Sequence, residues 1–265
     1  MLKQTFSLRE HICTQFDTSE DRLEYLKGQY RGETAYILAS GPSFTHYSKE
    51  FLNEFLKDKL VISIKQTYDV VPDQVDFHLI NFCNLNVYNY TRPDTIVGWT
   101  VWDNSQPSQI LGNNFRCDYI LDVYKLGDGS PNIDNSIAVQ QEYEKLSMEH
   151  SLSRPWGPGM MYELAVPLAV YLGCSKVVTL GWDLFGNALE KYKDVDNNKG
   201  MLQDHYFDNL TFEQTRTHVS NKEITSVINS TENFYRWMQS QGVDLEIVDP
   251  YGTNPAFSGI PRTML

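Results

Sequence analysis

Short apolar runs alternate with apolar residues at helical spacing along most of the chain, and polar turns that contain glycine or proline separate them. The short runs, rich in β-branched and aromatic residues, predict strands. These strands lie at about residues 36–39, 60–64, 75–80, 95–102, 119–123, 177–180 and 245–248. The helical spacing predicts helices at about residues 20–29, 51–59, 137–146, 160–172 and 220–241. Pro167 should kink or break the fourth of these helices, and Gly173 should end it.

Strands that alternate with helices favour a mainly parallel sheet with helices on both of its faces. The fold class predicted is therefore α/β, of Rossmann-like type. A chain of 265 residues fits a single nucleotide-binding domain over residues 1–265. Residues 187–217 are polar and lose their periodicity, so we expect a lid insertion there.

Composition narrows the classes of function. Hydrophobic residues make up 41% of the chain, enough for a sizeable core, and the net charge of −12 argues against general binding of nucleic acid. The four cysteines have no C-x-x-C spacing, which predicts a reducing compartment and no zinc site. The first residues lack the apolar core of a signal peptide, and the longest apolar run is far short of the ~20 residues of a membrane span. We therefore expect a cytoplasmic protein with no transmembrane segment; a homo-oligomer is left open.

The segment AYILASGPSF, residues 35–44, predicts a buried strand, a tight turn of small residues and then a helix. In an α/β sheet such a turn lies at the carboxyl end of the strand, where ligands bind. Gly41 would let a ligand approach the backbone, and the amides at the helix start would favour an anion. We interpret Ser40, Gly41, Pro42 and Ser43 as a phosphate cradle for a nucleotide. The alternative is an ordinary strand-to-helix turn.

A second turn, Gly181-Trp182-Asp183, follows the strand predicted at residues 177–180. Asp183 could hold a ribose, a sugar hydroxyl or a metal ion at the carboxyl end of that strand, or it could only cap the turn. A third glycine-containing loop runs from Arg154 to Gly159. There the guanidinium of Arg154 could bind a phosphate or carboxylate with two hydrogen bonds, or it could be a solvated loop residue.

His218 is the strongest candidate for a general base. It lies two positions before Ser220, which with Glu223 forms the capping box of the last predicted helix. The positive end of a helix disfavours a cationic imidazole, so His218 should stay neutral and able to accept a proton. The alternative is a polar loop histidine. Tyr192, in the predicted lid, could donate a hydrogen bond to a leaving phosphate or could pack on the surface.

Three sequence blocks occur in a familiar order: Ala39-Ser-Gly-Pro-Ser43, then the block from Leu172 to Leu184 that contains Leu-Gly-Trp-Asp-Leu, then His218-Val-Ser-Asn221. Together they resemble the small bacterial CMP-sialic-acid-dependent sialyltransferases. The same blocks resemble a sister group, the motility-accessory-factor proteins and archaeal dihydropterin pyrophosphokinases. The closing residues 256–265 are more similar to that second group.

The sialyltransferase resemblance implies roles for particular residues. His218 would match the general base, residues 41–43 the nucleotide turn, and Tyr192 one of two tyrosines that bind the departing phosphate. Lys65 stands where that family has an asparagine after the second strand, and Gln66 follows it. Arg154 matches the family arginine only with an offset. We also assign Gly159, Gly181 and Asp183 to the nucleotide site.

We therefore expect a glycosyltransferase that moves a sugar, sialic-acid-like or another, from a nucleotide donor to a glycan hydroxyl. The resemblance implies a CMP-linked donor, and no cofactor or metal is required. One alternative is a Mg-dependent diphosphokinase-like enzyme, with Asp183 as metal ligand. The other is a nucleotide-binding accessory protein without catalytic activity, which would serve surface-glycan or flagellar assembly.

Overall fold

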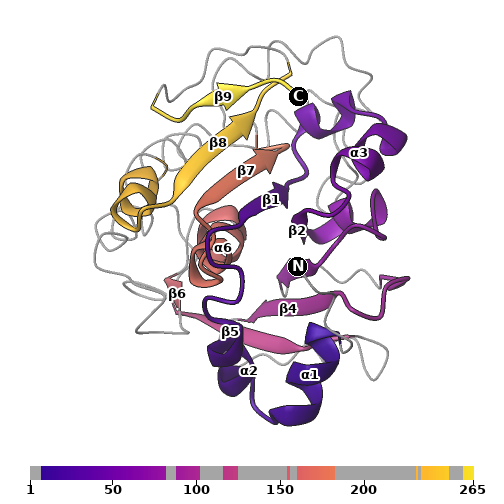
Figure 1. The fold of residues 1–265 in the computed structure, drawn as a ribbon, viewed down its shortest axis with the longest axis vertical. Coiled ribbons are helices and arrows are strands. Elements are labelled where there is room, and N and C mark those ends of the chain that lie inside the picture. Colours follow the sequence, from indigo (N-terminus) through magenta and orange to yellow (C-terminus); the bar gives the residue numbers. More distant parts are fainter. Residues whose placement is uncertain are drawn as a thin grey trace.

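The centre of the protein is a parallel sheet of nine strands in the order β6-β5-β4-β3-β2-β1-β7-β8-β9, seen in a computed structural model (Figure 1). The structure describes residues 7–81, 88–101, 116–124, 154–155, 160–182, 231, 234–250 and 259–265. All the strand pairings described there are parallel. The strands are β1 (Thr34–Leu38), β2 (Leu60–Ile64), β3 (Phe77–Asn81), β4 (Ile96–Val101), β5 (Tyr119–Tyr124), β6 (Arg154–Pro155), β7 (Lys176–Leu180), β8 (Asp244–Val248) and β9 (Arg262–Thr263). The predicted α/β fold with a parallel sheet is confirmed.

The order of the strands reverses direction between β1 and β7. From β1 the chain adds β2 to β6 outward on one side, and it then returns to place β7 on the other side of β1. The register pairs Leu38 at the end of β1 with Ser63 of β2 and with Leu180 at the end of β7. In Figure 1 the arrowheads of β1, β7 and β8 point to the same side of the molecule as the chain's C-terminus. This reversal is a topological switch point.

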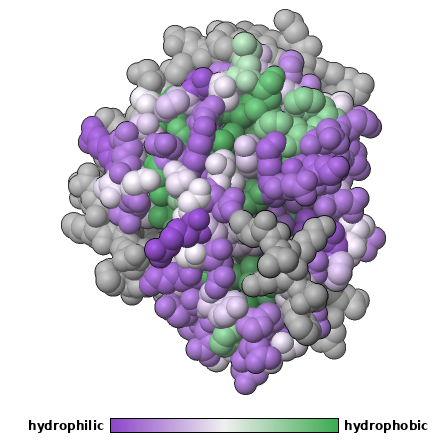
Figure 2. Space-filling view, in the orientation of Figure 1, coloured by the Kyte–Doolittle hydropathy of each residue, from purple (hydrophilic) through white to green (hydrophobic). Residues whose placement is uncertain are grey.

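Helices cover both faces of the sheet, as the sequence predicts. On one face lie α1 (Leu8–Gln15), α2 (Ser19–Leu26), α6 (Val166–Tyr171) and the helical residues 234–240, which pack on alternate strand residues such as Ile37 and Ile62. On the other face lie α3 (Lys49–Phe55) and the short 3-10 helices η1 (Pro42–His46) and η2 (Lys65–Asp69). On the face seen in Figure 2, hydrophilic residues dominate the surface, and hydrophobic residues show mainly between them in the upper half.

Several helix boundaries follow directly from sequence. Side chains of Ser7, Thr18 and Ser48 accept hydrogen bonds from backbone amides in the first turns of α1, α2 and α3. The predicted break at Pro167 is confirmed: residues Met161–Ala165 form a π-helix, η3, and the proline lies in the first turn of α6. Gly173 has φ of 86°, the left-handed conformation that ends this helix.

Other boundaries differ from the prediction. The helix α1 and the two-residue strands β6 and β9 were not predicted from the sequence. Arg154 lies in β6 and not in a loop. The first turn is followed by the five-residue η1, and α3, Lys49–Phe55, begins two residues before and ends four residues before the helix predicted at 51–59. The apolar stripe predicted for that segment is divided: Leu52 is fully buried, whereas Phe51 is 41% exposed.

Residues 187–217, with the predicted lid, and the predicted helix at 137–146 lie outside the described residues. The last predicted helix is described only at residue 231 and over 234–240, followed by Gly242 in the left-handed conformation expected of a helix end. Within the parts of the chain that the structure describes, no helix is long and apolar enough to cross a membrane.

Candidate functional site

The turns that follow β1 and β7 are bonded to each other at the switch point. The β1–β7 ladder continues past the strand ends, since the amide of Ala39 donates to the carbonyl of Leu180 at 2.8 Å. The amide of Gly41 then donates to the carbonyl of Gly181 at 2.9 Å. The two turns therefore form one hydrogen-bonded unit at the carboxyl edge of the sheet, where open α/β folds bind ligands.

Gly181 is required at this crossing. Its φ is 77°, and a Cβ atom built on it would lie 2.0 Å from the carbonyl oxygen of Ala39 and 2.9 Å from the Cβ of Phe44. Any side chain would push the two turns apart. The structure therefore explains the glycine in the Leu-Gly-Trp block by the close approach of two backbones.

The backbone amide of Gly41 is engaged within the protein. Gly41 is the N-cap residue of η1 with φ of −70°, a conformation that any residue can adopt. Its amide already donates to Gly181, so an anion bound here would take its hydrogen bonds from other groups. Ser43 is 1% exposed and lies at the base of the turn.

The turn after β2 lies beside this unit. Register places Ser40 and Lys65 at the same level, because Leu38 pairs with Ser63 two residues before each. Lys65 has φ of 51°, which is rare for a residue with a long side chain. Gln66 is 7% exposed, whereas Lys65 is half-buried. The cationic side chain of Lys65 thus starts at the carboxyl edge, one strand away from the switch point.

The side chain of Thr67 joins this turn to the end of β1 by hydrogen bonds. Its hydroxyl oxygen accepts a hydrogen bond from the amide of Ile64 at 3.0 Å. The hydroxyl lies 2.9 Å from the carbonyl of Ile64 and 3.0 Å from that of Leu38, both of which can accept its proton. The conformation of η2 is therefore coupled to the end of β1.

His78, fully buried in β3, holds the same turn from the other side. Its Nε2 lies 2.8 Å from the carbonyl oxygen of Lys65, and its Nδ1 lies 2.7 Å from the hydroxyl of Tyr90. A carbonyl only accepts, so Nε2 carries the proton, and Tyr90 must donate to Nδ1. The imidazole stacks on Tyr68, with ring centroids 4.7 Å apart. Burial lowers the pKa of His78 to about 3, so the ring is neutral at physiological pH.

His78 was not predicted as a site residue. The available signal was a histidine in the middle of the apolar run FHLIN, but its partners depend on how β3 and η2 meet in space. A second pair was also missed: Arg262 donates to Asp249 at 3.0 Å, and Asp249 is only 4% exposed. Asp249 directly follows β8, which ends at Val248, and its ion pair with Arg262 joins the carboxyl end of β8 to β9.

The structure brings together some of the predicted site residues. Ser40, Gly41, Pro42, Ser43, Lys65, Gln66 and Gly181 all lie at the carboxyl ends of β1, β2 and β7. Arg154 does not join them, because four strands separate β6 from β1. His218, Tyr192, Gly159 and Asp183 lie outside the described residues.

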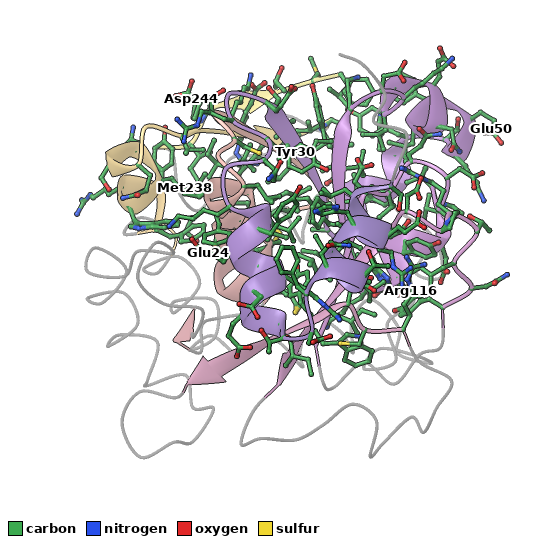
Figure 3. All side chains as sticks on the ribbon, turned by 60° about the horizontal axis from the view of Figure 1, so that its bottom comes forward. Glu24, Tyr30, Glu50, Arg116, Met238 and Asp244 are labelled. Carbon is green, nitrogen blue, oxygen red and sulfur yellow. The ribbon has the colours of Figure 1, made fainter. Side chains whose placement is uncertain are left out.

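The amino edge of the sheet holds a cluster of paired charges. Asp118, 2% exposed, accepts from Arg9 at 2.9 Å and from the amide of Val97 at 2.8 Å. Arg116, beside α1 and α2 in Figure 3, approaches the same carboxylate at 3.6 Å. Asp76 repeats the pattern one strand pair away: it accepts from the amide of Val61 at 2.9 Å and pairs with Arg92 at 3.1 Å. These carboxylates are used within the protein, which gives them a structural role.

No cluster of three or more histidine, cysteine, aspartate or glutamate residues that could hold a metal ion occurs among the described residues. Asp183, the metal ligand of the diphosphokinase alternative, lies outside them.

Comparisons with protein-family models, with curated proteins and with solved structures found no match to this chain. The resemblance to sialyltransferases therefore rests on the three sequence blocks alone, and that to dihydropterin pyrophosphokinases on the same blocks and on residues 256–265.

Proposed function

We propose that the protein binds a nucleotide at the switch point between β1 and β7 and is a glycosyltransferase that uses a nucleotide-linked sugar. One observation carries the binding site: the turns after β1 and β7 cross at Gly181 in a fully parallel sheet, with Lys65 beside them. Parallel sheets bind ligands outside the carboxyl ends of their strands at such a point. A lysine there would attract a phosphate locally, whereas the net charge of −12 on the whole chain would repel it.

The proposed reaction transfers the sugar from the phosphate of the donor to a hydroxyl of a glycan. The bond between the anomeric carbon and the phosphate oxygen breaks, a bond to the acceptor oxygen forms, and the acceptor proton passes to His218. Tyr192 would hydrogen-bond the departing phosphate. These two roles come from the resemblance, and the reaction needs no metal ion because donors of the protein stabilise the leaving group.

The first experiment is a thermal-shift panel of CMP, CDP, UDP, GDP, ADP and ATP, each with Mg²⁺ and with EDTA. A ligand at 100 times its Kd adds about 2.7 kcal/mol to the free energy of unfolding, a readable shift. Stabilisation by CMP in EDTA is the expected result. Stabilisation only by ATP or ADP with Mg²⁺ would favour the diphosphokinase alternative, and no shift with any nucleotide would refute the binding site.

The second experiment measures hydrolysis of CMP-sialic acid in EDTA. His218→Ala should lower turnover by roughly 10²–10⁴-fold because it removes the general base, while CMP still binds. His205→Ala is the matched control, since this histidine lies in the adjacent polar segment, residues 187–217, and has no proposed role. Turnover within about twofold of wild type in His218→Ala would remove this residue from the mechanism. Binding without any turnover in the wild type would favour the accessory-protein alternative.

A further inference from the structure

We propose that His78 is a positioning residue of the nucleotide site: its Nε2–H holds the Lys65 carbonyl and so keeps Lys65 in the left-handed conformation that presents its side chain beside Ser40. This inference rests on the proposed function, because it assumes that the carboxyl edge of β1 and β2 binds the ligand. It adds a buried residue of β3 that does not touch the ligand but determines the shape of its site.

The backbone of Lys65 is unusual for its residue type. Positive φ is costly for residues other than glycine, and such conformations persist only where the surroundings impose them. The other non-glycine residue with positive φ in the described chain is Asp58, with φ of 59°. Aspartate tolerates this region well, and Asp58 lies in an exposed turn after α3. Lys65 instead lies at the end of a fully buried strand, at the edge where ligands bind.

The surroundings that impose this conformation are identifiable. On one side Thr67 bonds η2 to β1, and on the other His78 bonds the carbonyl of Lys65 at 2.8 Å. Ring packing holds His78 in place: Tyr68 stacks on the imidazole with ring centroids 4.7 Å apart, and Tyr88 packs edge-on at 4.5 Å. The carbonyl of Lys65 can only accept, so it selects the tautomer with the proton on Nε2.

Loss of this hydrogen bond would release Lys65 to ordinary conformations and redirect its side chain. If the binding-competent conformer then makes up one tenth of the population, the apparent Kd for a nucleotide rises about tenfold. A histidine that only filled space in the core would affect the stability of the fold but would not couple in this way to one backbone turn.

Two substitutions separate these roles. In His78→Gln the amide nitrogen can reach the position of Nε2 and donate to Lys65. In His78→Asn the shorter side chain reaches only the position of Nδ1 and cannot. We expect the Kd of CMP, measured in EDTA, to rise about tenfold in His78→Asn and to stay within about threefold of wild type in His78→Gln. Tyr90→Phe, which keeps the imidazole and its bond to Lys65, is the matched control and should also stay within about threefold.

A spectroscopic measurement reads the turn directly. Lys–Gln dipeptides occur at Lys3-Gln4 and Lys65-Gln66, so labelling lysine carbonyls with ¹³C and glutamine amides with ¹⁵N gives two HNCO signals. A Lys3→Arg variant identifies the first. The Lys65 signal should keep its wild-type position in His78→Gln and Tyr90→Phe and move in His78→Asn, which loses the hydrogen bond to that carbonyl.

The outcomes are distinct. An unmoved Lys65 signal in His78→Asn, or a moved signal with unchanged CMP affinity, overturns the proposal. A tenfold loss in Tyr90→Phe as well would mean that general loosening of the aromatic cluster, and not the Lys65 bond, weakens binding; this also overturns it. If the wild type binds none of the six nucleotides, the proposed function fails and the positioning role fails with it, although the Lys65 signal still reports whether His78 holds the turn.

Discussion

The two edges of the parallel sheet keep their shapes by different means. At the amino edge, buried carboxylates accept from the first amides of neighbouring strands and pair with arginines, as Asp118 does with Val97 and Arg9. At the carboxyl edge, backbone groups bond each other across the switch point, and Gly181 and Lys65 have positive φ. The turn that contains Lys65 is held by His78, a buried neutral histidine.

This difference separates stability from binding. Charges at the amino edge are satisfied within the protein, so they fix the starts of the strands and attach α1 and α2 to the sheet. The left-handed conformation of Lys65 at the carboxyl edge lowers stability, and proteins keep such strain where it shapes a site. Substitutions at the amino edge should therefore change stability alone, whereas those at the carboxyl edge should change stability and binding together.

The largest effect is expected for Gly181→Ala. The new Cβ would meet the carbonyl oxygen of Ala39 at 2.0 Å, and the backbone would have to keep a left-handed conformation. We expect a loss of about 4 kcal/mol in the free energy of unfolding, measured with urea, together with loss of nucleotide binding. Gly242→Ala is the control: its φ is 71°, but nothing lies within 4 Å, so only the left-handed penalty of about 1 kcal/mol applies. Equal losses in the two variants would contradict the crossing as the reason for Gly181.

Asp118→Ala tests the amino edge. It leaves the amide of Val97 without its acceptor and separates Arg9 from its partner, so we expect a loss of about 3 kcal/mol in the free energy of unfolding. The Kd of CMP should remain within about twofold of wild type, because the proposed nucleotide site lies at the opposite edge. Lys176→Ala, which breaks a more exposed ion pair with Glu246, should cost less than about 1 kcal/mol. A strong loss of CMP affinity in Asp118→Ala would show that the two edges are coupled.

The pH dependence of stability tests the histidine beneath the carboxyl edge. In the folded protein the pKa of His78 falls from 6.5 to about 3 because of burial, and Tyr68, Tyr88, Tyr90 and Arg116 surround or influence the ring. Between these pH values the unfolded chain binds the proton and the folded protein does not, so stability falls as the pH drops. Protonation of this one histidine in the unfolded chain lowers the free energy of unfolding by about 1.4 kcal/mol for each pH unit from about pH 6 down to pH 4.

The contribution of His78 is measured by difference. Urea unfolding at pH 6, 5 and 4 should show a shallower acid loss for His78→Gln than for wild type, while Tyr90→Phe keeps the wild-type slope. Parallel pH profiles for wild type and His78→Gln would mean that the imidazole binds its proton equally in the folded and unfolded states, and burial would then not lower the pKa of His78.

Elements of the fold could be predicted from the sequence where they depend on neighbouring residues in the chain, and not where they depend on long-range contacts. The apolar run LVISI predicts β2 over residues 60–64, and all five side chains are buried in the structure. Pro167 and Gly173 could also be predicted, because they act through their own backbone preferences. The helix α1 buries only Ile12, so its sequence carries little apolar signal. The strands β6 and β9 have two residues each and exist through their neighbours.

The same distinction applies to the site. Turn residues such as Ser40 and Gly41 were predicted because they directly follow an apolar run. Strand order, which removes Arg154 from the switch point, depends on long-range pairing. The role of His78 depends on the meeting of β3 with η2, which no spacing in the sequence encodes. Its chemistry becomes visible only when its two partners are known.

The smallest expected effect is at Ser63, in the middle of β2 between the two edges. Register places it between Leu38 of β1 and His78 of β3, and its hydroxyl is fully buried with no hydrogen-bond partner among the residues that the structure describes. A buried hydroxyl that makes no bond opposes folding, so Ser63→Ala should leave the free energy of unfolding unchanged or raise it by up to about 1 kcal/mol. Thr67→Val is the control, because that hydroxyl bonds Ile64 and Leu38, and its loss should cost about 2 kcal/mol. If Ser63→Ala instead cost as much as Thr67→Val, the hydroxyl would have a partner in solution, and the polar groups beneath the carboxyl edge would extend into the centre of the sheet.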